Sequence, residues 1–209
     1  MRVTKVQARI RNGPENTGTT LTTPPPDTFR HRLRRDTSSA HATLDTLLSK
    51  LDLTTAEGLA PFLVIQNRAL RSLAPLSTKA ATSAVIRDLI DRTGADLDQL
   101  GTPSGIAPPA PSQMVDPMAL DYLVAGSRLG TAVLAKRWAQ ATDPKVQRAN
   151  AYFAGQSHLE LWQSLCHQLS SMPADHCQAE KIVNDSNLLF EFYTSCAKDA
   201  LGTGIPVYG

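Results

Sequence analysis

The chain has 209 residues, 42% of them hydrophobic, and its 21 basic and 19 acidic residues give a formal net charge of +2. This length is enough for one ordinary domain with a sizeable core. The balanced charge gives no reason to expect nucleic acid or a membrane surface as a partner. No apolar run reaches the roughly 18 residues of a membrane span, and the N-terminus lacks the apolar core of a secretory signal.

Three cysteines, Cys166, Cys177 and Cys196, are scattered without metal-ligand spacing. We interpret them as thiols in a reducing compartment and expect a cytoplasmic protein. Residues 1–26 are rich in proline and turn-forming residues and have little to bury, so we expect a disordered N-terminal extension. Residues 27–201 would then form one helical domain, followed by a loose tail at 202–209.

Helical periodicity dominates the predicted domain. One helix is expected over residues 27–51, because its leucines fall on one helical face. Thr54 and Glu57 have the spacing of a capping box, which predicts a second helix that ends before Pro75.

A third helix is predicted from about Ser77, with Gly94 at its C-terminal cap and a short turn at 96–100. Residues 102–112 contain four prolines and should form a loop without a helix.

Further helices are expected after the central segment of the chain. Asp143 before Pro144 predicts a helix that ends near Gly155. The segment 157–160 has the pattern of a second capping box, which predicts a helix to about Ser170. Pro173 and Asp175 restart the chain, and one long helix should follow to about Leu201. Strand patterns are absent, so the sequence predicts an all-α, single-domain bundle of seven or eight helices.

The central helix is predicted between Asp116 and Ala139, since Asp116 and Pro117 make a side-chain cap and a proline start. It contains two glycines four residues apart, Gly126 and Gly130. Such a pair indicates either close packing of another helix or the approach of something flat to the backbone. From this helix alone, close packing is the favoured interpretation.

His41 lies beside the apolar face of the first predicted helix. A single histidine in this position is more often structural than a metal ligand. Together, however, the histidine helix and the glycine helix would fit the two sides of a planar cofactor such as haem. Arg34, Lys136 and Arg137 could then meet its propionates at the rim.

At these residues the sequence resembles the haem oxygenases, particularly the short bacterial forms, including those associated with bacterial phytochromes. The segment from Leu33 to Asp45 is similar to the proximal-helix signature, with a basic pair, Thr37, and His41 four residues later. The segment from Tyr122 to Gly130 is similar to the distal signature Tyr-x-x-x-Gly-Ser-x-Leu-Gly. An aromatic cluster at 190–193 matches the last long helix of the family.

The resemblance implies a haem-oxygenase bundle in which haem b, as both substrate and cofactor, lies between the proximal and distal helices. O₂ and external electrons would be used to cleave a meso carbon, giving biliverdin, carbon monoxide and iron. His41 would be the proximal iron ligand, and the distal backbone at Gly126 and Gly130 would direct bound oxygen. Ser127 stands where some members carry an aspartate, so Arg128 could help to hold water. The remaining residues implied to contact haem are Arg34, Thr37, Tyr122, Thr131, Lys136, Phe190 and Tyr193.

Thr131 departs from the family pattern, in which many members have a glycine or alanine after the second glycine. Because threonine is branched at Cβ, it is bulkier and stiffer. If it faces the haem it could restrict access, and if its hydroxyl points inward it could hold a distal water. The sequence leaves both possibilities open.

No flavin or nicotinamide motif is present, so electrons would have to come from a ferredoxin or a reductase. A basic group could form the docking surface for this donor: Arg34, Arg35, Lys136 and Arg137. An equally simple interpretation of these residues is a solvated rim. The resemblance also suggests a bacteriophytochrome as acceptor of biliverdin.

Two other functions fit the sequence. A haem carrier or sensor on the same fold would bind haem through His41 without degrading it. A helical interaction protein without cofactor would explain the helices but not the order of the two signatures. A zinc or di-iron site is disfavoured, because the five histidines show no Glu-x-x-His pairing. His31 is the only rival haem ligand, and it lacks the matching threonine.

Overall fold

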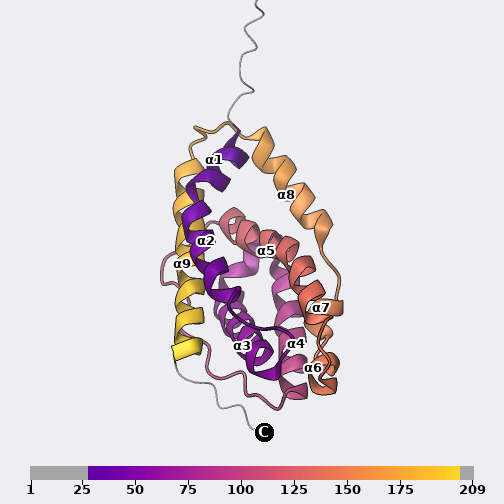
Figure 1. Cartoon of the computed structure of the whole chain (residues 1–209). Helices are drawn as coiled ribbons and strands as arrows, with labels where there is room; N and C mark the ends of the chain where they lie inside the picture. The colour runs from indigo at the N-terminus through magenta and orange to yellow at the C-terminus, as the bar shows by residue number, and fades with distance from the viewer. Residues whose placement is uncertain (1–27, 203–209) are drawn as a thin grey trace, which may run out of the picture.

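A computed structural model describes residues 28–202, so the expectations for residues 1–27 and 203–209 lie outside the described residues. The described chain folds into nine α-helices and one 3₁₀ helix without a strand, which confirms the all-α fold class (Figure 1). None of these helices is long and apolar enough to cross a lipid bilayer. The α-helices are α1 (Phe29–Asp36), α2 (Ser38–Leu48), α3 (Ala56–Leu73), α4 (Ser83–Gln99), α5 (Pro117–Trp138), α6 (Pro144–Arg148), α7 (Ala151–Ala154), α8 (Leu159–Ser171) and α9 (Ala179–Gly202).

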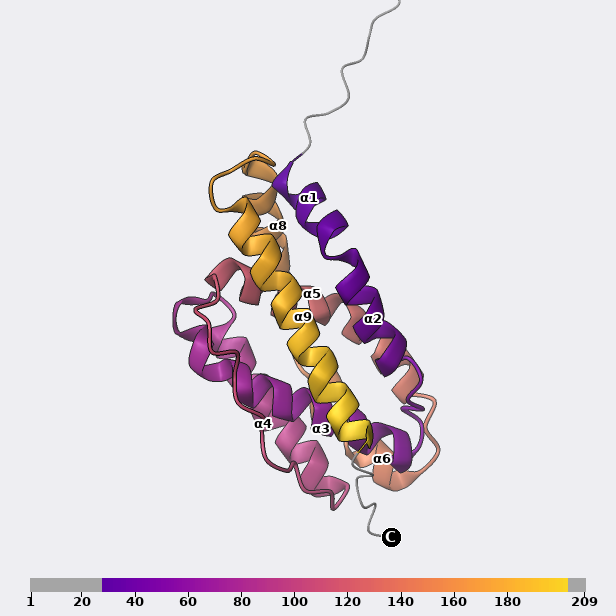
Figure 2. The same cartoon turned by 90° about the vertical axis from the view of Figure 1, so that its left-hand side faces the viewer.

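The longest helix, α9, lies alongside α1 and α2 in both views of the chain (Figures 1 and 2). It also packs against α3 and α5, so it joins the two halves of the bundle. The pair α3 and α4 forms the other half, and α8 covers the far side of α5. Apolar side chains from all these helices form one core.

The single helix predicted over residues 27–51 is wrong, because α1 and α2 are separated at Thr37. Thr37 has φ −104° and ψ −3°, and its buried hydroxyl donates to the Leu33 carbonyl oxygen at 2.7 Å. Ser38 likewise donates to the Arg35 carbonyl. Hydroxyl side chains that bond to nearby backbone compete with the helix, and here two adjacent ones accompany a break.

The third helix also differs from the prediction. A 3₁₀ helix occupies Ala74–Lys79, α4 begins only at Ser83, and it continues through Gly94 and the predicted turn to Gln99. The glycine that ends α4 is Gly101, which has a positive φ of 63°, and the amide of Thr102 bonds back to Leu97. This left-handed glycine is the ordinary end of a helix, and it lies seven residues beyond the predicted cap at Gly94.

Three further boundaries are corrected. The N-cap of α3 is Thr55, whose hydroxyl accepts from the Gly58 amide, while Thr54 donates to Asp52. The predicted helix from Asp143 to Gly155 is two short helices, α6 and α7. The N-cap of α8 is His158, in a left-handed conformation with φ 52° and without a side-chain cap bond, so the expected capping box does not form.

The start of α5 is fixed to α9 through carboxylates. Asp116 accepts a hydrogen bond from the Met118 amide, as the sequence predicted, and its own amide donates to Asp185 at 2.6 Å. Asp185 is 4% exposed and also accepts from Lys181 on its own helix. One buried carboxylate therefore determines where the central helix begins relative to α9.

Replacing Asp185 should destabilise the fold through this contact. Asp185→Ala leaves the Asp116 amide without its partner, which costs about 1–3 kcal/mol. We expect the free energy of unfolding in urea to fall by about 2 kcal/mol on that basis. The exposed Asp91→Ala should change it by less than about 0.5 kcal/mol. Equal effects of the two substitutions would contradict this role of Asp185.

Candidate functional site

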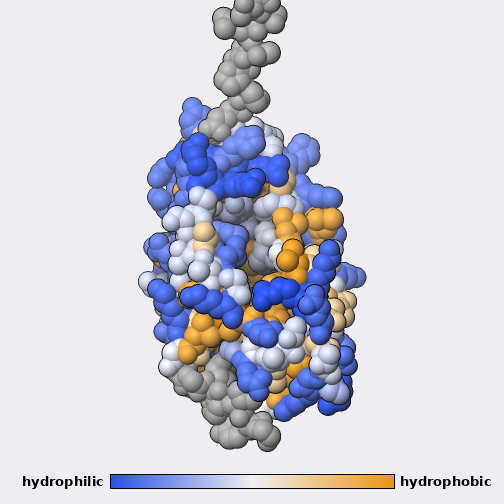
Figure 3. All heavy atoms as spheres, in the orientation of Figure 1, coloured by the Kyte–Doolittle hydropathy of each residue, from blue (hydrophilic) through white to orange (hydrophobic). Residues whose placement is uncertain are grey.

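The predicted site lies between α2 and α5. Both helices pack against α9, yet they make little direct contact with each other. Figure 3 shows a hollow at the centre of this face, between α2 and α8, with hydrophobic surface along its edge. The Arg137 guanidinium of α5 donates to the Leu51 carbonyl oxygen at 2.9 Å, which joins the two sides below the hollow.

His41 lies on α2 with its side chain 53% exposed. Its Nδ1 is 3.0 Å from a carboxylate oxygen of Asp45, one helical turn later. Since an ionised carboxylate only accepts, this contact places the imidazole hydrogen on Nδ1 and leaves the Nε2 lone pair free. The ring meets Phe190 of α9 edge-on, with 5.3 Å between ring centroids. His41 is therefore held from two sides with its metal-binding nitrogen available.

A row of aromatic rings runs from His41 across to α8. Phe190 contacts Tyr122 of α5 at 6.4 Å between centroids, and Tyr122 contacts Trp162 of α8 at 6.0 Å. Trp162 also lies beside Gly126, where an added Cβ would be 3.3 Å from the indole ring. Gly126 therefore packs closely against a tryptophan, whose ring would have to shift by a few tenths of an ångström to admit a larger residue.

Gly130 has different surroundings, because an added Cβ there would meet no atom within 4 Å. Two large apolar side chains share this face of α5 at helical spacing, Leu129 at 45% and Val133 at 63% exposed. A bare stretch of helix backbone between exposed apolar side chains suits a flat hydrophobic ligand. Gly126 thus fits the first interpretation of the glycine pair, close packing of another helix. The surroundings of Gly130 suit the second interpretation, the approach of something flat to the backbone.

The other predicted residues of this helix segment have partners within the protein. Thr131 is 5% exposed, and its hydroxyl donates to the Ser127 carbonyl oxygen at 3.3 Å, so it does not narrow the face that carries Gly130. Ser127 is exposed but donates to the Val124 carbonyl. Arg128 is 6% exposed and stacks over Tyr152 at 5.0 Å, with Nε and one terminal nitrogen lacking a protein partner among the described residues.

Two residues predicted to contact haem are buried in the protein. Thr37 is 1% exposed at the break between α1 and α2. Tyr193 donates to the Gln66 side-chain oxygen at 2.6 Å, and burial raises the pKa of its hydroxyl well above the ordinary value. The structure therefore gives both hydroxyls internal partners.

The basic residues predicted at the rim are only partly brought together. Arg34 at the end of α1 and Lys136 at the end of α5 are exposed. Arg35 pairs with Asp36 at 2.9 Å, and Arg137 is bonded to backbone as described above. Arg34 and Lys136 are thus the pair best placed to meet an acidic group at the surface.

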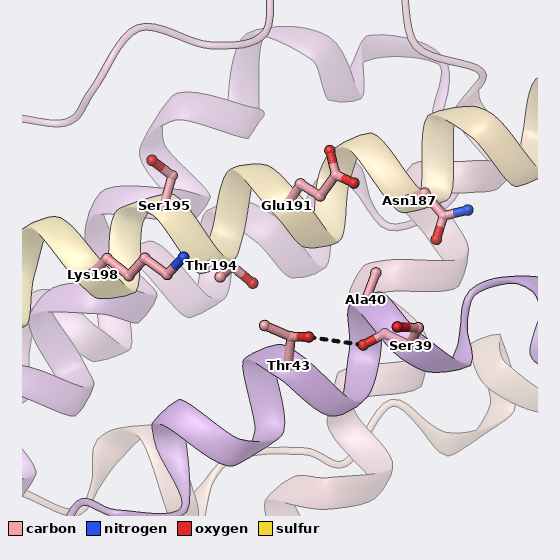
Figure 4. A pocket seen from close by; sticks show the side chains of 8 residues that line it. All are labelled: Ser39, Ala40, Thr43, Asn187, Glu191, Thr194, Ser195 and Lys198. Carbon is pink, nitrogen blue, oxygen red and sulfur yellow. Dashed lines mark hydrogen bonds between the residues drawn. The ribbon is translucent and has the colours of Figure 1, made fainter.

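A separate polar groove of about 420 Å³ lies between α9 and the side of α2 that faces away from His41 (Figure 4). It is lined by Ser39, Ala40, Thr43, Asn187, Glu191, Thr194, Ser195 and Lys198. None of the predicted site residues lines this groove.

Sequence reasoning missed two residues of the site. Asp45 is the last residue of the segment that resembles the proximal signature. Its position four residues after His41 was the signal for a contact between the two side chains. Trp162 lies on a helix that carried no predicted function, and only the packing of α8 on α5 brings it to Gly126.

The fold is that of the haem oxygenases. Among solved structures, the chain is similar to the NO- and CO-bound heme oxygenase from Neisseria meningitidis, with a TM-score of 0.62. The likeness covers 84% of this chain and 92% of that one at 21% sequence identity, so it shows the fold alone. No protein-family model and no curated protein sequence matches the chain.

The open face at Gly130 can be tested by adding a methyl group. Gly130→Ala should raise the free energy of unfolding by about 1 kcal/mol, because alanine is the better helix former. The same methyl group would obstruct a ligand lying flat on the helix, where overpacking costs about 1–3 kcal/mol. We therefore expect haemin affinity, measured by absorbance titration, to fall about tenfold.

Gly94→Ala is the matched control, because Gly94 is inside α4 and its Cβ would meet only Asn67, at 4.0 Å. It should stabilise the protein similarly and leave haemin affinity unchanged. An equal affinity of the Gly130 and Gly94 variants would show that the Gly130 face is not where haemin lies.

The contact between Asp45 and His41 can be tested in the same assay. Asp45→Ala removes the acceptor that orients the imidazole, and loss of such a partner typically costs about 10–100-fold in metal affinity or activity. We expect haemin affinity to fall about tenfold, with the far-UV circular dichroism unchanged. Asp91→Ala, on an exposed face of α4, is the control. Unchanged affinity in the Asp45 variant would exclude a role in ligation.

Proposed function

We propose that the protein is a haem oxygenase, which binds haem between α2 and α5 and cleaves it at a meso carbon to biliverdin, carbon monoxide and iron. The observations that carry the proposal are the exposed His41 on α2, held through Nδ1 by Asp45, and the bare backbone at Gly130 on α5, on two helices that both pack against α9. The haem-oxygenase fold supports the proposal. The two signatures in the sequence, around His41 and around Gly130, support it as well.

On the proximal side, His41 Nε2 would bind the haem iron. The Asp45 carboxylate keeps the hydrogen on Nδ1 and increases the basicity of the ligating nitrogen. Phe190 limits rotation of the imidazole ring through its edge contact. These two contacts fix the direction of the ligand before haem arrives.

On the distal side, α5 would present backbone in place of side chains. Gly130 allows a flat ring to approach the helix, while Leu129 and Val133 supply the apolar surface that excludes water. Gly126 lets Trp162 close the end of this surface. Of the polar groups nearby, the Ser127 hydroxyl is bonded to its own helix, so protons would arrive through water held near the backbone.

Bound haem would supply both the iron that binds O₂ and the carbon that is oxidised, and the protein would supply orientation and electrostatics. Electrons would come from a ferredoxin or a reductase in the cytoplasm. Arg34 at the end of α1 and Lys136 at the end of α5 are exposed and would pair with propionates or with acidic groups of the donor. Biliverdin would pass to an acceptor such as a bacteriophytochrome.

A comparison of two histidine variants tests the proposal. The purified protein receives haemin, the visible spectrum is recorded, and ascorbate or a ferredoxin system is added in air. We expect a Soret band that decays to the spectrum of biliverdin. In His41→Ala the Soret band should move, because its position depends on the iron ligand. Activity should fall at least about tenfold, because the iron loses its protein ligand. His31→Ala is the matched control, since His31 is exposed on α1 and its ring lies 3.3 Å from the Thr28 hydroxyl.

The other outcomes are equally informative. A stable Soret band under reductant and air would make the protein a haem carrier or sensor that uses the same ligand. Complete absence of a Soret band would exclude both haem functions. Loss of binding in the His31 variant with retention in the His41 variant would move the ligand to α1.

A further inference from the structure

Side chains donate to backbone carbonyl groups at the break between α1 and α2. Leu33 O keeps the Thr37 amide at 3.0 Å, the donor four residues later that a continuous helix supplies, and also accepts from the Thr37 hydroxyl at 2.7 Å. Arg35 O accepts from the Ser38 hydroxyl at 2.7 Å. These donors are local, so they do not relate the break to the rest of the bundle.

The third carbonyl, that of Asp36, has a donor from a distant part of the chain. It accepts a hydrogen bond from the Asn187 side-chain nitrogen at 3.2 Å, and Asn187 belongs to α9. This bond joins residues 151 positions apart in the chain. Figure 4 shows Asn187 on α9 at the end of the groove where α2 begins. The end of α1, two residues before α2 begins, is thus tied to α9.

Asn187 and Phe190 are three residues apart, so they lie on the same side of α9. Phe190 contacts the His41 ring, and Asn187 holds the backbone five residues before His41. Helix α9 therefore determines two quantities at once, the position where α2 starts and the orientation of the imidazole. A displacement of either contact would turn His41 relative to the cleft.

We infer that Asn187 is a positioning residue for His41: its hydrogen bond to the Asp36 carbonyl fixes the direction of α2 and so aims the imidazole across the cleft toward α5. Asn187 lines the polar groove and bonds to the last residue of α1, so it acts through the junction of α1 and α2. The effect on haem iron rests on the proposed function. The effect on the position of the His41 ring does not.

The test compares Asn187→Asp with Asn184→Asp. The aspartate at 187 has the shape of asparagine but cannot donate, and it would repel the carbonyl that it faces. Asn184 lies almost one turn earlier on α9 and is exposed, and its side chain donates to Glu180 at 3.5 Å. Asn184→Asp therefore introduces the same change in charge on α9 as Asn187→Asp. Asn187→Ala removes the donor without adding charge and serves as the second variant.

The first measurement uses the haem-free protein. The Phe190 ring shifts the proton resonances of the His41 imidazole, because the two rings are in edge contact. We expect both Asn187 variants to lose this ring-current shift in the ¹H spectrum while Asn184→Asp retains it. A thermal melt shows that the variants are folded at the temperature of the spectrum.

The second measurement uses the haem complex. Transfer of haem to apomyoglobin should be about three- to tenfold faster for the Asn187 variants, which corresponds to the loss of one hydrogen bond. The iron–histidine stretching frequency in the resonance Raman spectrum should change as well, which a loss of stability alone would not cause.

Either of two results would overturn the inference. The Asn187 variants could melt at a lower temperature with unchanged His41 resonances, which would make Asn187 a structural residue only. The Asn184 variant could show the same shifts, which would make charge on α9 the cause. If the protein binds no haem, the first measurement still decides the role of Asn187 while the proposed function fails.

Discussion

The whole arrangement depends on α9, because it is the surface against which both α2 and α5 pack. Two helices that pack on a third without packing on each other leave a space between them, and the depth of that space is set by the side chains on the shared helix. Phe190 forms part of that floor, touching both His41 and Tyr122. The carboxylate of Asp185 then fixes where α5 starts. A site between two separate segments of chain is thereby built on one rigid element.

The two faces of α5 have opposite roles. One face carries Arg128 and Thr131, which are buried among the neighbouring helices. The other exposes backbone at Gly130 between Leu129 and Val133. Since helical residues three and four apart share a face, this division follows from the spacing in the sequence, and the packing of α9 and α8 determines which face stays open.

Much of the fold was predictable from sequence, because helix periodicity, the cap at Asp116 and the prolines are local signals. The errors concern features that depend on distant contacts. Gly94 is as plausible a helix end as Gly101, but Asp96 accepts the amides of Ala151 and Tyr152 from α7, which is consistent with α4 continuing past Gly94. For the site, the sequence placed His41 and the glycines on facing helices. The direction of Tyr193 and Thr131 required the register of packing, which single-helix patterns do not contain.

Trp162 has a consequence beyond closing the end of the cleft. The chain contains two tryptophans, and the other, Trp138, donates its indole hydrogen to the Val146 carbonyl at the far end of α5. One indole therefore lies beside Gly126 and Tyr122, next to the open face, and the other is anchored away from it. An absorbing ligand in the cleft would quench the emission of the first indole. The protein thus carries an intrinsic optical probe of whether its cleft is filled.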